Sequence, residues 1–107
     1  MGGEGPQIST HVLDTELGMP APGVAVSLFL IDGDSEVQVG GGTTDDDGRI
    51  RQVLDGELQT GTYRLAFELD GPFFRQASVT FVVEDTARSY HVPLLMAPYS
   101  LATYRGS

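Results

Sequence analysis

Two histidines, His11 and His91, are the side chains of this sequence best suited to proton transfer near neutral pH. Each lies in a short apolar run, Ile8–Asp14 for the first and Ser89–Leu95 for the second. In both runs the histidine alternates with the apolar residues, so on a β-strand it faces away from the core. An outward histidine on a hydrophobic strand is structural, solvated, interfacial or catalytic, and the residues alone leave these alternatives open.

A cation and a polar chain end complete the set of candidate residues. Arg49 follows the acidic turn Thr43–Gly48, at the point where a strand is expected to begin. The sequence ends on Tyr104-Arg105-Gly106-Ser107, whereas chain ends normally carry frayed and expendable residues. We therefore expect this polar end to be functional.

Other chemistries lack their sequence signatures. A metal site built on the two histidines has no third ligand at a recognisable spacing. The acidic turn does not follow the ligand pattern of an EF-hand calcium loop. There is no Gly-x-Ser-x-Gly nucleophile elbow, and Gly40–Gly42 is not followed by the lysine and helix of a phosphate-binding loop. We expect neither a metal nor a cofactor.

Short β-branched and aromatic runs alternate with Gly, Pro and Asp, which predicts an all-β sandwich of about eight strands. The expected strands are 8–14, 24–31, 36–43, 50–54, 62–69, a strand that includes 79–83, 89–95 and 99–104. Because residues 24–31 are apolar on both faces, that strand is expected to be central or covered on both sides. Pro93 lacks a ladder donor, so its strand is predicted to lie at a sheet edge or to end there.

Size and composition narrow the class of protein. At 107 residues the chain is predicted to be a single domain, 1–107, with residues 1–6 disordered. The formal net charge is −9 and all six cations are arginine, which argues against nucleic-acid binding. No apolar run approaches the ~20 residues of a membrane span, and the N-terminus lacks the features of a secretory signal. We expect a cytoplasmic protein, or a periplasmic one if a leader has been removed.

Four patterns occur in order along the chain. They are STHVLDT with GMPAPGV (9–15 and 18–24), DGR (47–49), YHVPLL (90–95) and TYRGS (103–107). Together they run from Ile8 to Ser107 and resemble 5-hydroxyisourate hydrolase of the transthyretin-related family. The terminal tetrapeptide is the part of the resemblance that separates the hydrolases from the hormone-carrying transthyretins, which keep the fold and lose the site.

The resemblance implies a transthyretin-like two-sheet β-sandwich that opens the ring of 5-hydroxyisourate, a product of urate oxidation in purine catabolism. It also implies a homotetramer, a dimer of dimers, with the sites in a channel between the dimers. The family's functional positions fall on four residues expected to be catalytic, His11, Arg49, His91 and Ser107. They also fall on three expected to bind substrate, Tyr104, Arg105 and Gly106.

Hydrolysis of a lactam requires a base on the attacking water, a cation at the developing oxyanion and a proton for the leaving nitrogen. We assign the base to one histidine, with His91 preferred, and the oxyanion to Arg49. His11 would orient or protonate the substrate, and Ser107 with its carboxylate would complete the pocket wall. Two alternatives are a non-catalytic transthyretin-like module that binds a small molecule, and a structural sandwich domain cut from a larger extracellular protein.

The chain departs from the family pattern between Phe67 and Val79. The family usually carries a longer stretch there, which includes its single short helix. Gly71-Pro72 opposes helix formation. We therefore predict that this helix is missing or reduced to one turn.

Overall fold

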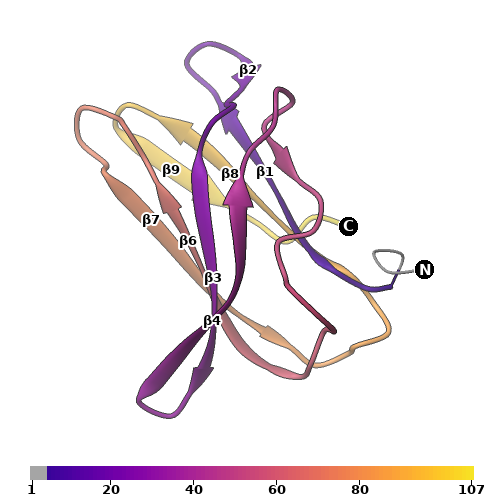
Figure 1. Cartoon of the computed structure of the whole chain (residues 1–107). Coiled ribbons are helices and arrows are strands. Elements are labelled where there is room, and N and C mark those ends of the chain that lie inside the picture. The colour runs from indigo at the N-terminus through magenta and orange to yellow at the C-terminus, as the bar shows by residue number, and fades with distance from the viewer. Residues whose placement is uncertain (1–4) are drawn as a thin grey trace.

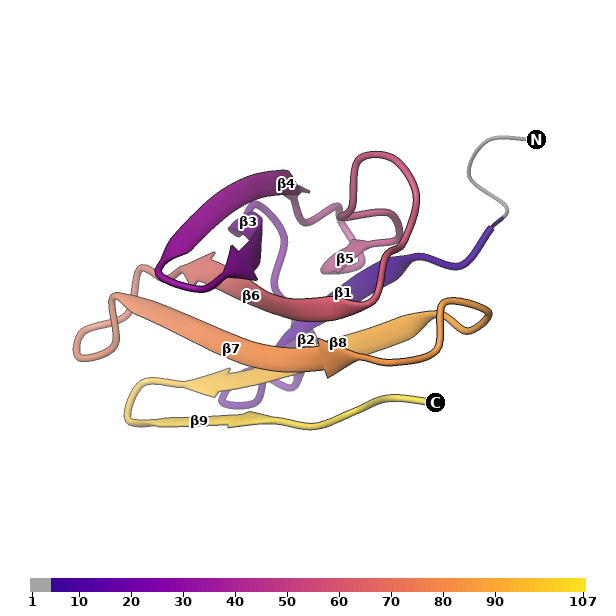
Figure 2. The same cartoon turned by 90° about the horizontal axis from the view of Figure 1, so that it is seen from below.

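The computed structural model describes residues 5–107, which form nine β-strands in two layers (Figures 1 and 2). The strands are β1 (Ile8–Asp14), β2 (Met19–Pro20), β3 (Ala25–Asp32), β4 (Ser35–Thr43), β5 (Arg49–Ile50), β6 (Gly61–Glu68), β7 (Gln76–Val83), β8 (Tyr90–Ala97) and β9 (Ser100–Thr103). One sheet has the order β2-β1-β8-β9, with β5 also paired to β1, and the other has the order β4-β3-β6-β7. The all-β sandwich is confirmed, although its prediction omitted the two-residue strand β2.

No helix occurs in residues 5–107, and hence none that is long and apolar enough to cross a membrane. The segment around Gly71-Pro72, between β6 and β7, is irregular. The expected loss of the family's short helix is therefore confirmed for the part of the chain that the structure describes. Residues 1–4, which make up most of the segment predicted to be disordered, lie outside the described residues.

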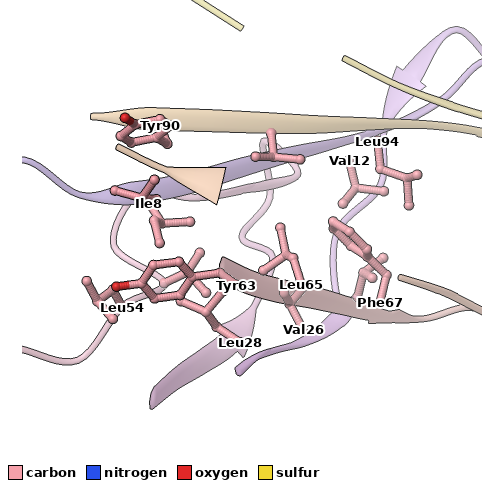
Figure 3. Packing of buried hydrophobic residues seen from close by; sticks show 14 of the residues in the cluster. Ile8, Val12, Val26, Leu28, Leu54, Tyr63, Leu65, Phe67, Tyr90 and Leu94 are labelled. Carbon is pink, nitrogen blue, oxygen red and sulfur yellow. The ribbon is translucent and has the colours of Figure 1, made fainter. Parts of the chain in front are cut away.

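The hydrophobic core lies between the two sheets, because alternate side chains of each strand point inward (Figure 3). On β6 the inward residues Tyr63, Leu65 and Phe67 are almost completely buried. Val12 of β1 and Leu94 of β8 approach them from the opposite sheet. This alternation places the intervening residues of β1 and β8 on the outer face of their sheet. Polar side chains at those positions are therefore accessible to a ligand on that face.

The strand β3 lies between β4 and β6, as its apolar character on both faces predicted. Its outer face is covered in part by the guanidinium of Arg64, which lies 4.6 Å from the centre of the Phe29 ring. Arg64 also forms an ion pair with Glu36 at 2.7 Å. This cover lies on one sheet, whereas β1, β5 and β8 belong to the other.

The strand β8 is an interior strand between β1 and β9, so the prediction that Pro93 marks a sheet edge or a strand end is wrong. The carbonyl and N–H of one residue point to the same side of a strand, and the Pro93 carbonyl accepts a hydrogen bond from Thr103 Oγ1 at 2.7 Å. The position without a donor therefore faces β9 and not β1. The antiparallel register pairs Leu94 with Thr103, and further along it pairs His91 with Gly106. Tyr104 therefore lies opposite Pro93, and it is the first residue after the end of β9.

The turn before β5 is held against β1 at Gly48. The φ angle of Gly48 is 75°, and a Cβ added there would overlap the carbonyl oxygen of Val12. The Val12 N–H donates a hydrogen bond to the Gly48 carbonyl at 2.7 Å. Glycine is required there both for its conformation and for its lack of a side chain. Because Arg49 is the next residue, this contact sets where that cation enters the sheet.

We expect Gly48→Ala to lower the free energy of unfolding more than the matched change Gly33→Ala. Gly33 also has a positive φ, of 61°, but nothing lies within 4 Å of its added Cβ. Gly33→Ala should cost about 1–2 kcal/mol for the left-handed backbone alone, and Gly48→Ala a further ~1–3 kcal/mol for overpacking. Urea denaturation of both variants measures the difference, and equal losses would show that the Val12 contact is unimportant.

Candidate active site

Strand pairing brings three of the predicted residues onto the outer face of one sheet. The parallel ladder between β1 and β8 pairs Ser9 with His91, and the antiparallel ladder between β1 and β5 pairs His11 with Arg49. Ser9, His11 and His91 are all partly buried and alternate with buried neighbours on their strands. Residues about 80 positions apart in the sequence thus become neighbours on one surface.

A polar pocket opens on this face with a volume of about 430 Å³, which is within the range of small-molecule sites. Its lining comes from β1, from β5 and the residue after it, from β8 and the residue before it, and from the end of the chain: Ser9, Thr10, Arg49, Ile50, Arg51, Ser89, His91 and Ser107. Two arginines therefore line one pocket of a chain whose formal net charge is −9. Such a local excess of cations favours a ligand rich in oxygen atoms or negative charge.

The His91 imidazole is contacted on two sides. Its Nδ1 lies 2.8 Å from Ser9 Oγ, and Gly106 is so close that an added Cβ would be 2.5 Å from His91 Cδ2. Burial lowers the pKa of His91, and the charges of His11 and Arg49 lower it further, whereas a backbone hydrogen bond to Ser9 acts in the opposite direction. The net lowering keeps the ring neutral near pH 7, which is the state that a general base requires.

We expect an NMR titration of His91 to give a pKa below the ordinary histidine value of 6.5. Because the folded pKa is depressed, the neutral ring stabilises the fold above that ordinary value, and the contribution is lost as the pH falls through the folded pKa. In the variant His11→Gln the pKa of His91 should rise, because the electrostatic effect of His11 that lowers it is gone. A His91 pKa at or above 6.5 in the unmodified protein would contradict the assignment.

His11 lies on the same face but is engaged differently. Its Nε2 is 2.8 Å from the carbonyl oxygen of Asp47, which can only accept, so this nitrogen carries the proton. His11 is not among the residues that line the polar pocket. The structure thus gives His11 a fixed orientation and leaves its Nδ1 as the nitrogen free for other contacts.

Arg49 is positioned through its backbone by the acidic turn. The Asp45 carboxylate accepts hydrogen bonds from the N–H groups of Arg49 at 3.0 Å and Asp47 at 2.9 Å. The hydrogen bond from Arg49 is the main cause that lowers the pKa of Asp45, so this acceptor stays ionised. Among residues 5–107, no carboxylate lies within ion-pair distance of Arg49 or Arg51, so both cations are available to a ligand.

The four residues at the end of the sequence divide between two surfaces. The Gly106 N–H donates to the His91 carbonyl at 2.8 Å, and Ser107 lines the polar pocket. Tyr104 and Arg105 instead line an apolar groove beside β7, where the Arg105 guanidinium lies 4.6 Å from the centre of the Tyr90 ring. The substrate-binding role of these two residues stays a prediction.

We expect Gly106→Ala to reduce turnover by displacing the His91 ring. The added methyl would approach Cδ2, Cγ and Cβ of His91 to between 2.5 and 3.4 Å, so either the ring or the terminal segment must move. Misplacement of a catalytic group by about 1 Å can cost roughly 100-fold in rate, and steady-state kinetics of the variant would measure the loss. Gly5→Ala, with nothing within 4 Å of its added Cβ, is the matched control. Unchanged turnover in Gly106→Ala would show that the contact is unimportant.

Three contributors to this arrangement were not predicted from the sequence: Ser9, Arg51 and Asp45. Ser9 is two residues before His11 and Arg51 is two after Arg49, so β-strand alternation was a usable signal for both. Asp45 was interpreted only as a turn residue. Within residues 5–107 no group of three His, Asp or Glu side chains is arranged to hold a metal ion.

Comparison with known proteins finds similar proteins over nearly the whole chain. A 5-hydroxyisourate hydrolase of Deinococcus radiodurans is 43% identical, with 95% of this chain and 97% of that protein covered. The solved 5-hydroxyisourate hydrolase of Klebsiella pneumoniae superposes with a TM-score of 0.81 at 33% identity, covering 95% of this chain and 99% of that one. A sea bream transthyretin in complex with thyroxine superposes with a TM-score of 0.84 at 27% identity, covering 92% and 93% of the two chains.

The model of the HIUase/Transthyretin family matches residues 8–106, which include every strand of the sandwich. The relatives similar to this chain include both hydrolases and a hormone-binding protein, so the fold alone does not separate the two activities. The residues of the polar pocket are the feature that can. On the strength of the family match and of relatives aligned over nearly their full length, the chain belongs to the HIUase/Transthyretin family.

Proposed function

We propose that the protein hydrolyses 5-hydroxyisourate to 2-oxo-4-hydroxy-4-carboxy-5-ureidoimidazoline. The observation that carries the proposal is the polar pocket, in which a histidine with a lowered pKa faces two arginines that have no ion-pair partner among residues 5–107. The similarity to named 5-hydroxyisourate hydrolases supports it. No feature of the pocket specifically favours a carrier that only binds a small molecule.

The reaction begins with water and a cyclic amide carbonyl. His91 takes a proton from the water as its oxygen attacks the carbonyl carbon, and the carbonyl electrons move onto the oxygen. Arg49 stabilises this oxyanion, and Arg51 adds a second guanidinium to the same pocket. When the oxyanion collapses, the ring C–N bond breaks and the nitrogen receives the proton that His91 took from the water. The former carbonyl carbon becomes a carboxylic acid, which loses a proton to solvent to give the carboxylate. His11, whose Nε2–H donates to the Asp47 carbonyl, orients the substrate.

A direct assay tests the activity. Urate oxidase generates 5-hydroxyisourate from urate in the cuvette, and the ultraviolet decay of that intermediate is followed with and without this protein. We expect decay to accelerate in proportion to the protein concentration. Decay at the spontaneous rate, with folded protein present, would contradict the proposed function and leave the binding module as the alternative.

We also propose the homotetramer, a dimer of dimers, that the family resemblance implies. Both β7 and β9 lie at the end of their sheets and have no further strand beside them within residues 5–107. Exposed apolar side chains lie on or near these strands, at Val82, Tyr99 and Tyr104. Light scattering coupled to size exclusion measures the mass, and a monomer at micromolar concentration would contradict this assembly. The cytoplasmic location stays a prediction.

A further inference from the structure

Ser9 is the residue of the pocket whose hydroxyl lies nearest to the proposed base. It follows Ile8 on β1 and pairs with His91 in the parallel ladder, so the two side chains emerge side by side from adjacent strands. Their contact joins Ser9 Oγ and His91 Nδ1 at 2.8 Å, between two partly buried residues. Because the strands on both sides of this contact are fixed by the sheet, the hydroxyl is held at the ring without a flexible loop.

The direction of this hydrogen bond decides what His91 can do. A neutral imidazole carries one proton, so a ring that donates from Nδ1 leaves Nε2 with a lone pair. If the ring accepted at Nδ1, the proton would sit on Nε2, and His91 would be a donor to substrate and not a base. In water the neutral histidine side chain prefers the Nε2–H form, so the protein has to favour the Nδ1–H form through the hydrogen bonds that it makes to the ring.

The proposed role of His91 requires donation from the ring. Nδ1 is engaged by Ser9 Oγ at 2.8 Å, so Nε2 is the other ring nitrogen, and it can take a proton from water only if the ring proton lies on Nδ1. On the other side of the ring, Gly106 leaves no space at Cδ2, which restricts rotation of the imidazole away from Ser9.

We propose that Ser9 is a positioning residue that accepts a hydrogen bond from Nδ1–H of His91 and so holds the tautomer whose Nε2 can take a proton from water. The proposal rests on the function proposed above, and it goes further by stating how the base is prepared. Ser9 acts through His91, and its hydroxyl need not touch the reacting atoms. The removal of Ser9 should therefore reduce the rate of the chemical step and spare substrate binding.

The test compares Ser9→Ala with Ser9→Thr and with Ser35→Ala. Ser35 is an exposed residue at the start of β4, in the sheet that does not contain β1 and β8. We expect Ser9→Ala to lower kcat about 10-fold, the worth of one hydrogen bond, with KM changed by less than roughly twofold. Ser9→Thr keeps a hydroxyl and should recover most of the lost rate, and Ser35→Ala should retain the unmodified rate. Circular dichroism and thermal melting verify that each variant is folded.

Nitrogen-15 NMR of the His91 ring gives a readout that does not depend on turnover. In the unmodified protein above the pKa of His91, we expect the proton on Nδ1, and in Ser9→Ala a shift of population toward Nε2–H. The Nε2–H form in the unmodified protein would overturn the proposal, as would a folded Ser9→Ala with unchanged kcat and an unchanged tautomer. Failure of the ring-opening assay with the expected tautomers present would instead overturn the proposed function and leave the positioning of His91 by Ser9 established.

Discussion

His91→Ala should lower kcat/KM for 5-hydroxyisourate by about 100- to 10,000-fold, which is the usual contribution of a positioned acid or base. The ring lines the polar pocket, and its lowered pKa keeps it neutral and able to accept a proton near pH 7. Alanine removes the only titrating group of β8 on that face but keeps the backbone pairing of Ser9 with position 91. Initial rates of ultraviolet decay, with the substrate generated in place, measure the loss.

Structural damage must be separated from lost chemistry in this experiment. His91 is only partly buried and is not in the hydrophobic core, so the variant should melt cooperatively with a small change in Tm. Thr80→Ala, an exposed position on β7 in the other sheet, is the control and should keep full activity. A folded His91→Ala with unreduced turnover would remove His91 from the mechanism and would leave His11 as the histidine to test.

Arg49→Met should lower kcat by about 100- to 1,000-fold, the loss typical of removing one group that stabilises an oxyanion. Methionine keeps much of the apolar length of the arginine side chain, so the change mainly removes the charge and its donors. No carboxylate among residues 5–107 pairs with Arg49, so the substitution leaves no described ionic partner without a counter-charge. Steady-state kinetics separate an effect on kcat from an effect on KM.

Arg49→Lys and Arg75→Met complete the test of the cation. Lysine restores the charge but not the forked donors, so it should recover part of the rate. Arg75 is largely exposed, and its contact with Asp70 is long, at 3.9 Å, so Arg75→Met should be close to the unmodified protein. If Arg49→Met changed KM alone and spared kcat, Arg49 would bind substrate without stabilising the transition state.

The sequence predicted those parts of the fold that depend on local alternation. Strand β1 was predicted with its observed limits, because the alternation of apolar and polar residues with a period of two can be read directly from the sequence. The outward faces of His11 and His91 followed from the same pattern. These predictions required no knowledge of which strands are neighbours.

What could not be predicted depends on strand pairing. The role of Ser9 requires that β1 lie parallel to β8 in the register that sets Ser9 beside His91, about 80 residues away. The placement of Pro93 failed for the same reason, since a missing donor is tolerated inside a sheet when the neighbouring strand ends opposite it. His11 and Arg49 were predicted as parts of one site only through the family resemblance, and the structure places them opposite each other in a ladder.

The ladder between β8 and β9 is interrupted at Pro93, and the chain end beyond this interruption forms one side of the polar pocket. The chain beyond Thr103 returns to β8 through the Gly106 N–H and rests on Tyr90 through Arg105, so it can open at less free-energy cost than the sandwich itself. Gly106 restricts the His91 ring, and the next residue, Ser107, lines the pocket. A ligand that contacts Ser107 therefore acts on the same short segment that orients the His91 ring. We expect a substrate that contacts Ser107 to hold this segment against β8, and its measured affinity to be reduced by the free energy of holding the segment there.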